Sequence, residues 1–261
     1  MIPDRSASPP PADAADELRS RLRSADGEEL ARLIAGQGDD LDPSNVRNAF
    51  RNPFLEAGHI EALAALPRLI RSYEIRRAIV THPRTPRALA LAHVGGLYWA
   101  DLTRIGVDTR LHPIVRRAAD RRLLGRLAGL AVGERTAVAR GCSAAVIGAL
   151  RLDPTPRVVR ALLENPRLTE GLLLPLVISE RANPRVLALV ASDRRWSVRL
   201  GVRKALCRNP ATPVADALRA LAALPATELA AIAADSRVAA AVRERARGLL
   251  RGRRADSGRE V

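Results

Sequence analysis

The strongest constraint on the fold of this chain is an internal repeat. When the 261-residue sequence is shifted by 127 positions (the repeat shift), residues 77–126 align with residues 204–253 without a gap. Matched positions include Ala78 with Ala205, Pro83 with Pro210, Thr85-Pro86 with Thr212-Pro213, Leu97 with Leu224, Leu102 with Leu229, Ile105 with Ile232, Asp108 with Asp235, and Val115-Arg116 with Val242-Arg243. An ungapped match of this length is hard to obtain by chance. Self-similarity at a fixed period is typical of repeat architectures.

A shorter motif recurs along the chain. It consists of a β-branched residue, an arginine, an alanine with an apolar neighbour, and then Asn-Pro. Its copies lie at 46–53, 75–83, 159–166 and 202–210, and His82 replaces the asparagine in the second copy. Asn-Pro ends a helix, because the residue before a proline is displaced from the α region. Thr-Pro begins the next helix, since threonine caps it and proline suits its first position.

The composition favours an all-helical chain. Ala, Leu and Arg dominate and form helices readily, whereas aromatic residues make up only 2%, too few for a β-sandwich or barrel. The apolar spacing predicts about fifteen short helices, including helices over 67–81, 111–130, 195–208 and 236–252. Such helices cannot bury their apolar faces alone, so we expect them to stack around one continuous core.

The motif resembles the HEAT repeat, in which a turn aspartate precedes Val-Arg and an alanine. This order occurs over 108–119, 153–161 and 193–205. The chain is also similar to the bacterial leucine-rich repeat variant proteins, which are armadillo-like. The resemblance covers roughly residues 24–253 and implies a right-handed α-solenoid of stacked helical hairpins. The iron–sulfur cluster of the repeat-variant family is not expected, because Cys142 and Cys207 are the only cysteines.

This reading sets the expected domain organisation. We expect a single solenoid domain over residues 13–253, with disordered tails at 1–12 and 254–261. The start of the chain lacks the apolar segment of a signal peptide. The longest apolar run, 171–178, contains Pro175 and is too short to span a bilayer. A cytoplasmic protein without a membrane span is therefore expected.

The chain is strongly basic, with a net charge of +15. Such a charge attracts nucleic acid, anionic membrane surfaces or acidic proteins. Of the 43 basic residues, 42 are arginine, which is also what the codon bias of a GC-rich genome produces.

Two arginine rows are the candidate partner-binding residues, together with an aromatic neighbour. Arg195, Arg199 and Arg203 recur every fourth residue, as do Arg243, Arg247 and Arg251, and Trp196 lies beside the first row. Residues four apart share a helix face, so each row is expected to present three like charges, either to an acidic partner or simply to solvent.

Other polar residues of the motif are expected to be structural. The Val-Arg arginines, at 47, 76, 116, 160, 203 and 243, are predicted to pair with turn aspartates. The Asn-Pro asparagines are predicted to hydrogen-bond backbone groups at helix ends, with His82 as a substitute.

The chain carries no recognisable catalytic or cofactor motif. It contains no phosphate-binding glycine loop, no serine nucleophile motif and no histidine pair with metal-ligand spacing. We therefore expect no cofactor, no metal and no catalysis, and a scaffold whose concave face binds another macromolecule, favouring a protein with an acidic surface.

Nucleic-acid binding is the alternative, and it predicts a steep salt dependence. Its enzymatic form is suggested by a resemblance to the HEAT-like alkylpurine DNA glycosylases, which use tryptophans and an aspartate around a damaged base. The candidates for these positions are Trp99 with Asp101, and Trp196 beside Arg194 and Arg195. Asp101 is more simply explained as a residue of the first turn of a helix.

Overall fold

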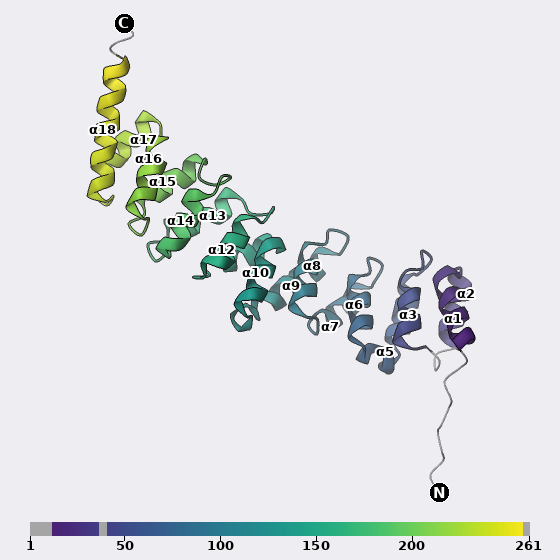
Figure 1. Cartoon of the computed structure of the whole chain (residues 1–261). Helices are drawn as coiled ribbons and strands as arrows, with labels where there is room; N and C mark the ends of the chain where they lie inside the picture. The colour runs from purple at the N-terminus through teal and green to yellow at the C-terminus, as the bar shows by residue number, and fades with distance from the viewer. Residues whose placement is uncertain (1–11, 37–40, 258–261) are drawn as a thin grey trace. The chain divides into compact units, whose positions relative to one another are not determined.

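The computed structural model describes residues 12–36 and 41–257, with side chains over 16–36 and 41–253. Every regular element in these ranges is a helix (Figure 1), which confirms the predicted all-α class. Of the two predicted tails, residues 1–11 and 258–261 lie outside the described residues.

The chain divides into two compact units, residues 1–123 and 124–261. Unit 1 contains α1 (Ala12–Ser24), α2 (Gly27–Gly36), α3 (Pro43–Ala49), α4 (Ala57–Ala64), α5 (Pro67–Arg71), α6 (Tyr73–Thr81), α7 (Arg87–Val94), α8 (Trp99–Val107) and nearly all of α9 (Pro113–Leu124). Unit 2 contains the short 3-10 helix η1 (Leu127–Gly129), α10 (Val132–Gly141), α11 (Ala144–Leu150), α12 (Pro156–Leu163), α13 (Glu170–Ile178), α14 (Pro184–Ser192), α15 (Leu200–Arg208), α16 (Val214–Ala222), α17 (Ala226–Ala234) and α18 (Ala240–Ser257). The single domain over 13–253 stays a prediction.

The internal repeat recurs helix by helix. The first residues of α6, α7, α8 and α9 align with the first residues of α15, α16, α17 and α18 under the repeat shift. The match extends beyond the aligned sequence, because α3 and α4 begin at positions that align in the same way with the starts of α13 and α14. Both copies share an ion pair: Arg77 lies 3.2 Å from Asp101, and the aligned Lys204 lies 2.6 Å from Glu228. The two units therefore contain copies of one helical pattern.

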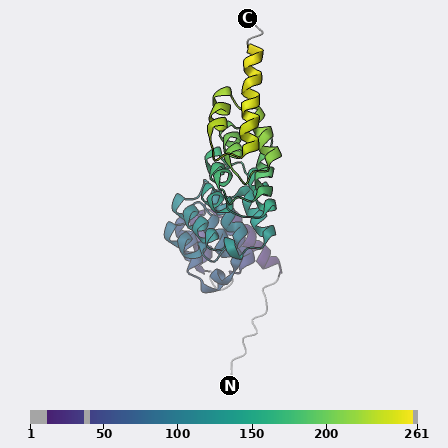
Figure 2. The same cartoon turned by 90° about the vertical axis from the view of Figure 1, so that its left-hand side faces the viewer.

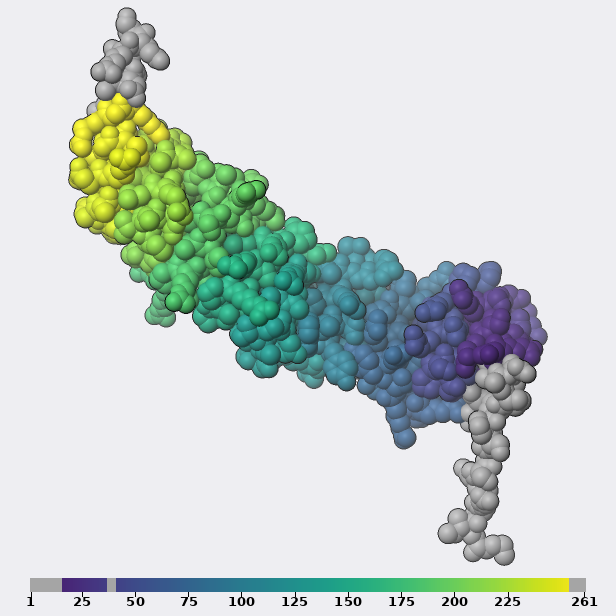
Figure 3. Space-filling view, in the orientation of Figure 1, coloured from purple at the N-terminus to yellow at the C-terminus, as the bar shows by residue number. Residues whose placement is uncertain are grey.

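Alternate helices pack against each other within unit 2. One row of neighbours consists of α10, α12, α14, α16 and α18, and a second row consists of α11, α13, α15 and α17 (Figures 1 and 2). α18, in yellow, lies directly on α16 and α17, and their surfaces meet without a gap on the face seen in Figure 3. The apolar residues of α16, α17 and α18 form one buried cluster.

The Asn-Pro asparagines join helices that lie far apart in sequence. The Asn52 amide donates to the carbonyls of Leu22 and Ala25, and the Asn209 amide donates to those of Val177 and Ser179. The predicted bonding of helix-end backbone groups is confirmed. His82 is confirmed as a substitute, since its Nδ1 accepts the N–H two residues on, as the asparagine oxygens do.

Several predicted helices have different limits. The predicted helix 67–81 is broken at Ser72, whose backbone is extended, and 111–130 consists of α9 and the short η1. The helix expected over 195–208 begins only at Leu200. Asp193 is the cause, because its carboxylate accepts the N–H groups of Arg195 and Trp196 and holds a turn there. The predicted helix 236–252 begins at Ala240 and continues to Ser257.

Candidate interaction surface

The first predicted arginine row does not form one helix face. Arg195 lies in the turn before α15, Arg199 is the residue preceding that helix, and Arg203 lies within it. The Arg195 guanidinium donates to the carbonyls of Asn165 and Leu168, at 3.2 and 2.9 Å. Arg203 likewise donates to backbone carbonyls, with Nε 2.7 Å from that of Ser197. Two of the three arginines therefore hold the fold together.

The second row lies on α18 and is partly neutralised. Arg247 and Arg251 both donate to the carboxylate of Glu244, at 3.2 and 3.4 Å. The hydrogen bond from Arg247, and after it the one from Arg251, holds the pKa of Glu244 below its ordinary value. The Nε atom of Arg243 is buried without a hydrogen-bond partner. The second row therefore does not present three exposed positive charges without a counter-charge.

Trp196 lies in the core of unit 2. Its side chain is 2% exposed, and its indole N–H donates to the carbonyl of Leu163. The Arg195 guanidinium covers the ring at 4.4 Å from its centroid. A partner cannot reach the indole in this conformation.

The turn aspartates bind other arginines directly than the Val-Arg arginines predicted for them. The pKa of Asp108 is lowered first by its hydrogen bond to Arg110 and also by the charge of the Val-Arg residue Arg116. Among the described side chains, the turn aspartates Asp108, Asp153 and Asp235 pair directly with Arg110, Arg135 and Arg237. The Val-Arg arginines have other contacts. Arg47 pairs with Glu74 at 2.9 Å, and Arg76 donates to two carbonyls at the end of α5. Sequence spacing alone did not distinguish these partners.

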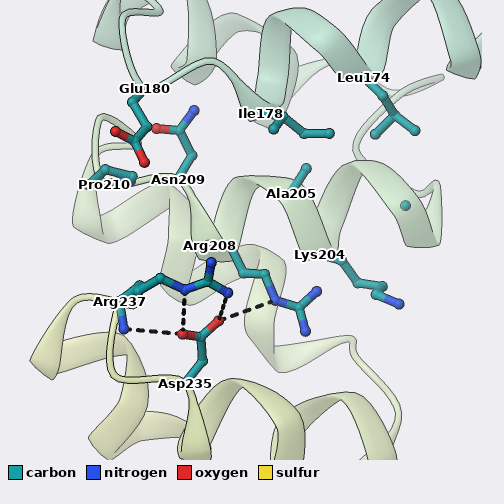
Figure 4. A pocket seen from close by; sticks show the side chains of 11 residues that line it. Leu174, Ile178, Glu180, Lys204, Ala205, Arg208, Asn209, Pro210, Asp235 and Arg237 are labelled. Atoms are coloured by element: carbon teal, nitrogen blue, oxygen red, sulfur yellow. Dashed lines mark hydrogen bonds and ion pairs between the residues drawn. The ribbon is translucent and has the colours of Figure 1, made fainter.

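A groove between α13, α15 and the end of α17 is the candidate site (Figure 4). Its volume is about 410 Å³. Leu174 and Ile178 from α13, with Ala205 from α15, provide an apolar floor, and Ile178 is 61% exposed. Large exposed aliphatic side chains in a groove mark a place where a partner can bury apolar surface.

Charged side chains line the rim of this groove. Lys204 is held by Glu228 at 2.6 Å. Arg237 binds Asp235, and this hydrogen bond keeps the pKa of Asp235 below its ordinary value. Arg208 is bound less tightly. It lies 3.9 Å from Glu228, and its contact with Asp235, drawn in Figure 4, is 4.0 Å long. Both distances are longer than hydrogen bonds. The Arg208 guanidinium therefore has N–H donors that can bind a carboxylate of a partner.

Unit 1 carries the same groove in a filled form, between α3 and α6. Six of its lining residues align with lining residues of the unit 2 groove under the repeat shift: Arg47, Arg51, Glu74, Arg77, Ala78 and Thr81 correspond to Leu174, Ile178, Gly201, Lys204, Ala205 and Arg208. The Arg47–Glu74 ion pair occupies the place of Leu174 and Gly201, and the cavity shrinks to about 220 Å³. The apolar floor is therefore specific to unit 2.

Sequence reasoning missed the groove residues. The useful signal was the repeat itself: extending the repeat shift to α3 and α13 places Ile178 on Arg51 and Leu174 on Arg47. Unit 2 has apolar residues at positions that are charged in unit 1, so its surface differs from that of unit 1 there.

Asp101 lies in the first turn of α8, as predicted, and is 8% exposed. The Tyr73 hydroxyl donates to its carboxylate, and Arg77 pairs with it at 3.2 Å. The Tyr73 ring stacks on that of Tyr98. These contacts give Asp101 a structural part in joining α6 to α8.

Cys142 and Cys207 are both buried and reduced. Burial raises the pKa of the Cys207 thiol to about 12. The described side chains include no group of His, Cys, Asp or Glu arranged to hold a metal ion. Among the described helices, none has the length and apolar character needed to cross a bilayer.

The comparisons place the chain in no family: no family model, curated protein or solved structure matches it.

Proposed function

We propose that the chain is a HEAT- or armadillo-like α-solenoid that acts as a non-enzymatic scaffold and binds a protein with an acidic surface. Two features support the architecture. Alternate helices of unit 2 contact each other in two rows, and the helical pattern of unit 1 recurs in unit 2 under the repeat shift. Stacked repeats of this kind present extended surfaces for partners.

The open groove of unit 2 is the observation that carries the binding proposal. Ile178, 61% exposed, lies where unit 1 has Arg51. An exposed aliphatic side chain costs solubility, and the copy in unit 1 folds with a charged residue at that position. We assign the groove to an apolar side chain of the partner, since removal of apolar surface from water is the dominant favourable term in most protein association.

Arg208 gives the groove its preference for acidic segments. Its two ion pairs, at 3.9 and 4.0 Å, leave N–H donors beside the apolar floor. A carboxylate next to the anchoring side chain of a partner can accept them in bidentate geometry. We therefore propose a partner segment in which an aliphatic residue is flanked by Asp or Glu.

Fluorescence anisotropy with labelled peptides tests this function. The probe is a short peptide of alternating glutamate and leucine, and the matched probe replaces each leucine with serine. The full chain is expected to bind the leucine peptide at least about tenfold more tightly, because only that peptide fills the apolar floor. Ile178→Glu is expected to lower the affinity at least about tenfold.

Leu152→Glu is the matched control, since Leu152 is 67% exposed and lies outside the groove. Arg208→Gln is expected to weaken the acidic peptide while leaving a peptide of alternating glutamine and leucine unaffected. Equal losses for Ile178→Glu and Leu152→Glu would contradict the proposal. Tighter binding of duplex DNA than of the leucine peptide by the parent chain would support the nucleic-acid alternative instead.

A further inference from the structure

A basic face on α7 and α9 distinguishes unit 1 from its copy in unit 2. Five exposed residues define it: Arg87 and Leu91 on α7, and Ile114, Arg117 and Arg121 on α9. Ile114, Arg117 and Arg121 are spaced three and four residues apart, so they share one side of α9. The Nε of Arg122 donates to the carbonyl of Gly95, so the last turn of α9 lies beside the end of α7.

The copy in unit 2 lacks this face. Arg87, Ile114, Arg117 and Arg121 align with Val214, Ala241, Glu244 and Gly248. Over residues 87–122 there are seven arginines and three acidic residues, a net charge of +4. Over the aligned residues 214–249 there are five arginines and four acidic residues, a net charge of +1. The helical pattern therefore forms without the exposed arginines of α7 and α9, and stability of the fold does not explain them.

The arginine charges of this face act together on His112. Desolvation and the charges of Arg87, Arg117 and Arg116 lower the pKa of the His112 imidazole, which lies between α7 and α9. Asp108, which precedes α9, binds Arg110 at 2.7 Å, and the Asp120 carboxylate packs against Gly106 of α8. Like charges on one helix face are unfavourable unless a counter-charge offsets them.

We propose that the basic face of α7 and α9 binds an acidic protein segment that carries an aliphatic side chain. Leu91 is 36% exposed and Ile114 is 40% exposed. Arginine is enriched at protein interfaces, whose buried centre is apolar, whereas contacts to a phosphate backbone come from polar side chains and backbone N–H groups. This inference rests on the proposed scaffold function and adds a second surface to it, formed by unit 1.

The repeat supplies the substitutions for a test. Arg87→Val, Ile114→Ala and Arg117→Glu give unit 1 the residues that the chain already carries at the aligned positions of unit 2. The control variant, Arg157→Glu with Arg185→Val, makes the same charge change at exposed arginines of unit 2. Both sets are introduced into the Ile178→Glu background, so that the unit 2 groove does not contribute. The probes are the labelled glutamate–leucine peptide and duplex DNA.

The Ile178→Glu chain is expected to retain measurable binding of the peptide. The triple substitution is expected to weaken that binding at least about tenfold, and the control less than about twofold. Equal affinity before and after the triple substitution overturns the inference, while a loss with Ile178→Glu still supports the proposed function. A larger loss for DNA than for the peptide also overturns it, because the face would then serve a phosphate backbone. Circular dichroism establishes that each variant is folded.

Discussion

A single asparagine can join two neighbouring helices of this chain. Asn165 is fully buried, and its amide donates to the carbonyls of Ala139, at 2.8 Å, and of Cys142, at 3.3 Å. Its oxygen accepts the N–H of Arg167 at 2.8 Å. One side chain thus satisfies backbone groups at the end of α10 and in the turn after α12, and buried backbone groups without partners are costly.

Asn165→Ala is expected to lower the free energy of unfolding by about 3 kcal/mol, because two buried carbonyls lose their donor. Asn183→Ala is the comparison, since Asn183 is only partly buried and makes one bond to a preceding carbonyl, that of Pro154 at 3.1 Å. Its expected cost is about 1 kcal/mol. Urea denaturation of both variants measures the difference. A smaller loss for Asn165→Ala than for Asn183→Ala would contradict this assignment.

Cys207 makes stability depend on alkaline pH. Burial raises its thiol pKa from 9.0 to about 12 in the folded chain. Between these values the unfolded chain releases the thiol proton while the folded chain retains it, so stability falls as the pH rises. The slope is at most about 1.4 kcal/mol per pH unit. Denaturation series at several alkaline pH values should show a shallower decline for Cys207→Ala than for the parent; parallel declines would refute the assignment.

At the scale of elements, one pair of residues between α8 and α9 differs from the aligned pair between α17 and α18. Gly106 of α8 lies under the carboxylate of Asp120. The aligned residues in unit 2 are Ala233 and Arg247, and Arg247 donates to the carbonyl of Ala233 at 3.3 Å. The small residue is thus required only where the carboxylate packs closely.

Gly106→Ala is expected to destabilise the chain by about 1–2 kcal/mol, because the added Cβ lies 3.2 Å from Asp120 Cγ and closer still to Oδ1. Adding Asp120→Arg, which reproduces the unit 2 pair, is expected to recover part of that loss. Gly148→Ala, inside α11 with open space around it, is expected to add about 0.5–1 kcal/mol. Thermal unfolding of the three variants measures these changes. Additive losses in the double variant would contradict the coupling.

Sequence periodicity predicted most helices but not where local side chains interrupt them. The helix expected over 195–208 lacks its first turn because the Asp193 carboxylate binds two backbone N–H groups. The side chain of Arg195 in that turn donates to the carbonyls of Asn165 and Leu168. Such a long-range contact has no signature in a window of neighbouring residues. Because Arg195 makes this contact and lies outside the helix, it does not belong to the predicted binding row. The wrong helix start and the wrong binding row therefore have the same cause.

At the scale of the whole chain, the internal repeat was a better guide to candidate binding residues than the spacing of charges. The spacing suggested arginine rows, yet Arg203 and Arg247 turned out to bind carbonyls or a nearby glutamate. Comparison of the two copies instead separates shared structural pairs, such as Arg77–Asp101 and Lys204–Glu228, from positions that differ. The groove floor and the basic face are both differences of this kind, and neither is required by the helical pattern.

A stack of repeats also predicts how far the effect of a destabilising substitution extends along the chain. In such a stack each helix is stabilised mainly by its neighbours, so a local defect raises local unfolding without loosening distant helices. Hydrogen–deuterium exchange of the full chain with Asn165→Ala should therefore increase over 132–178, where α10 to α13 lie, and stay unchanged over 12–36 in α1 and α2. The reciprocal variant, Asn52→Ala, should raise exchange in α1 and α3, because Asn52 binds the carbonyls of Leu22 and Ala25. An equal increase throughout the chain in either variant would mean that one cooperative core, and not a stack, maintains the fold.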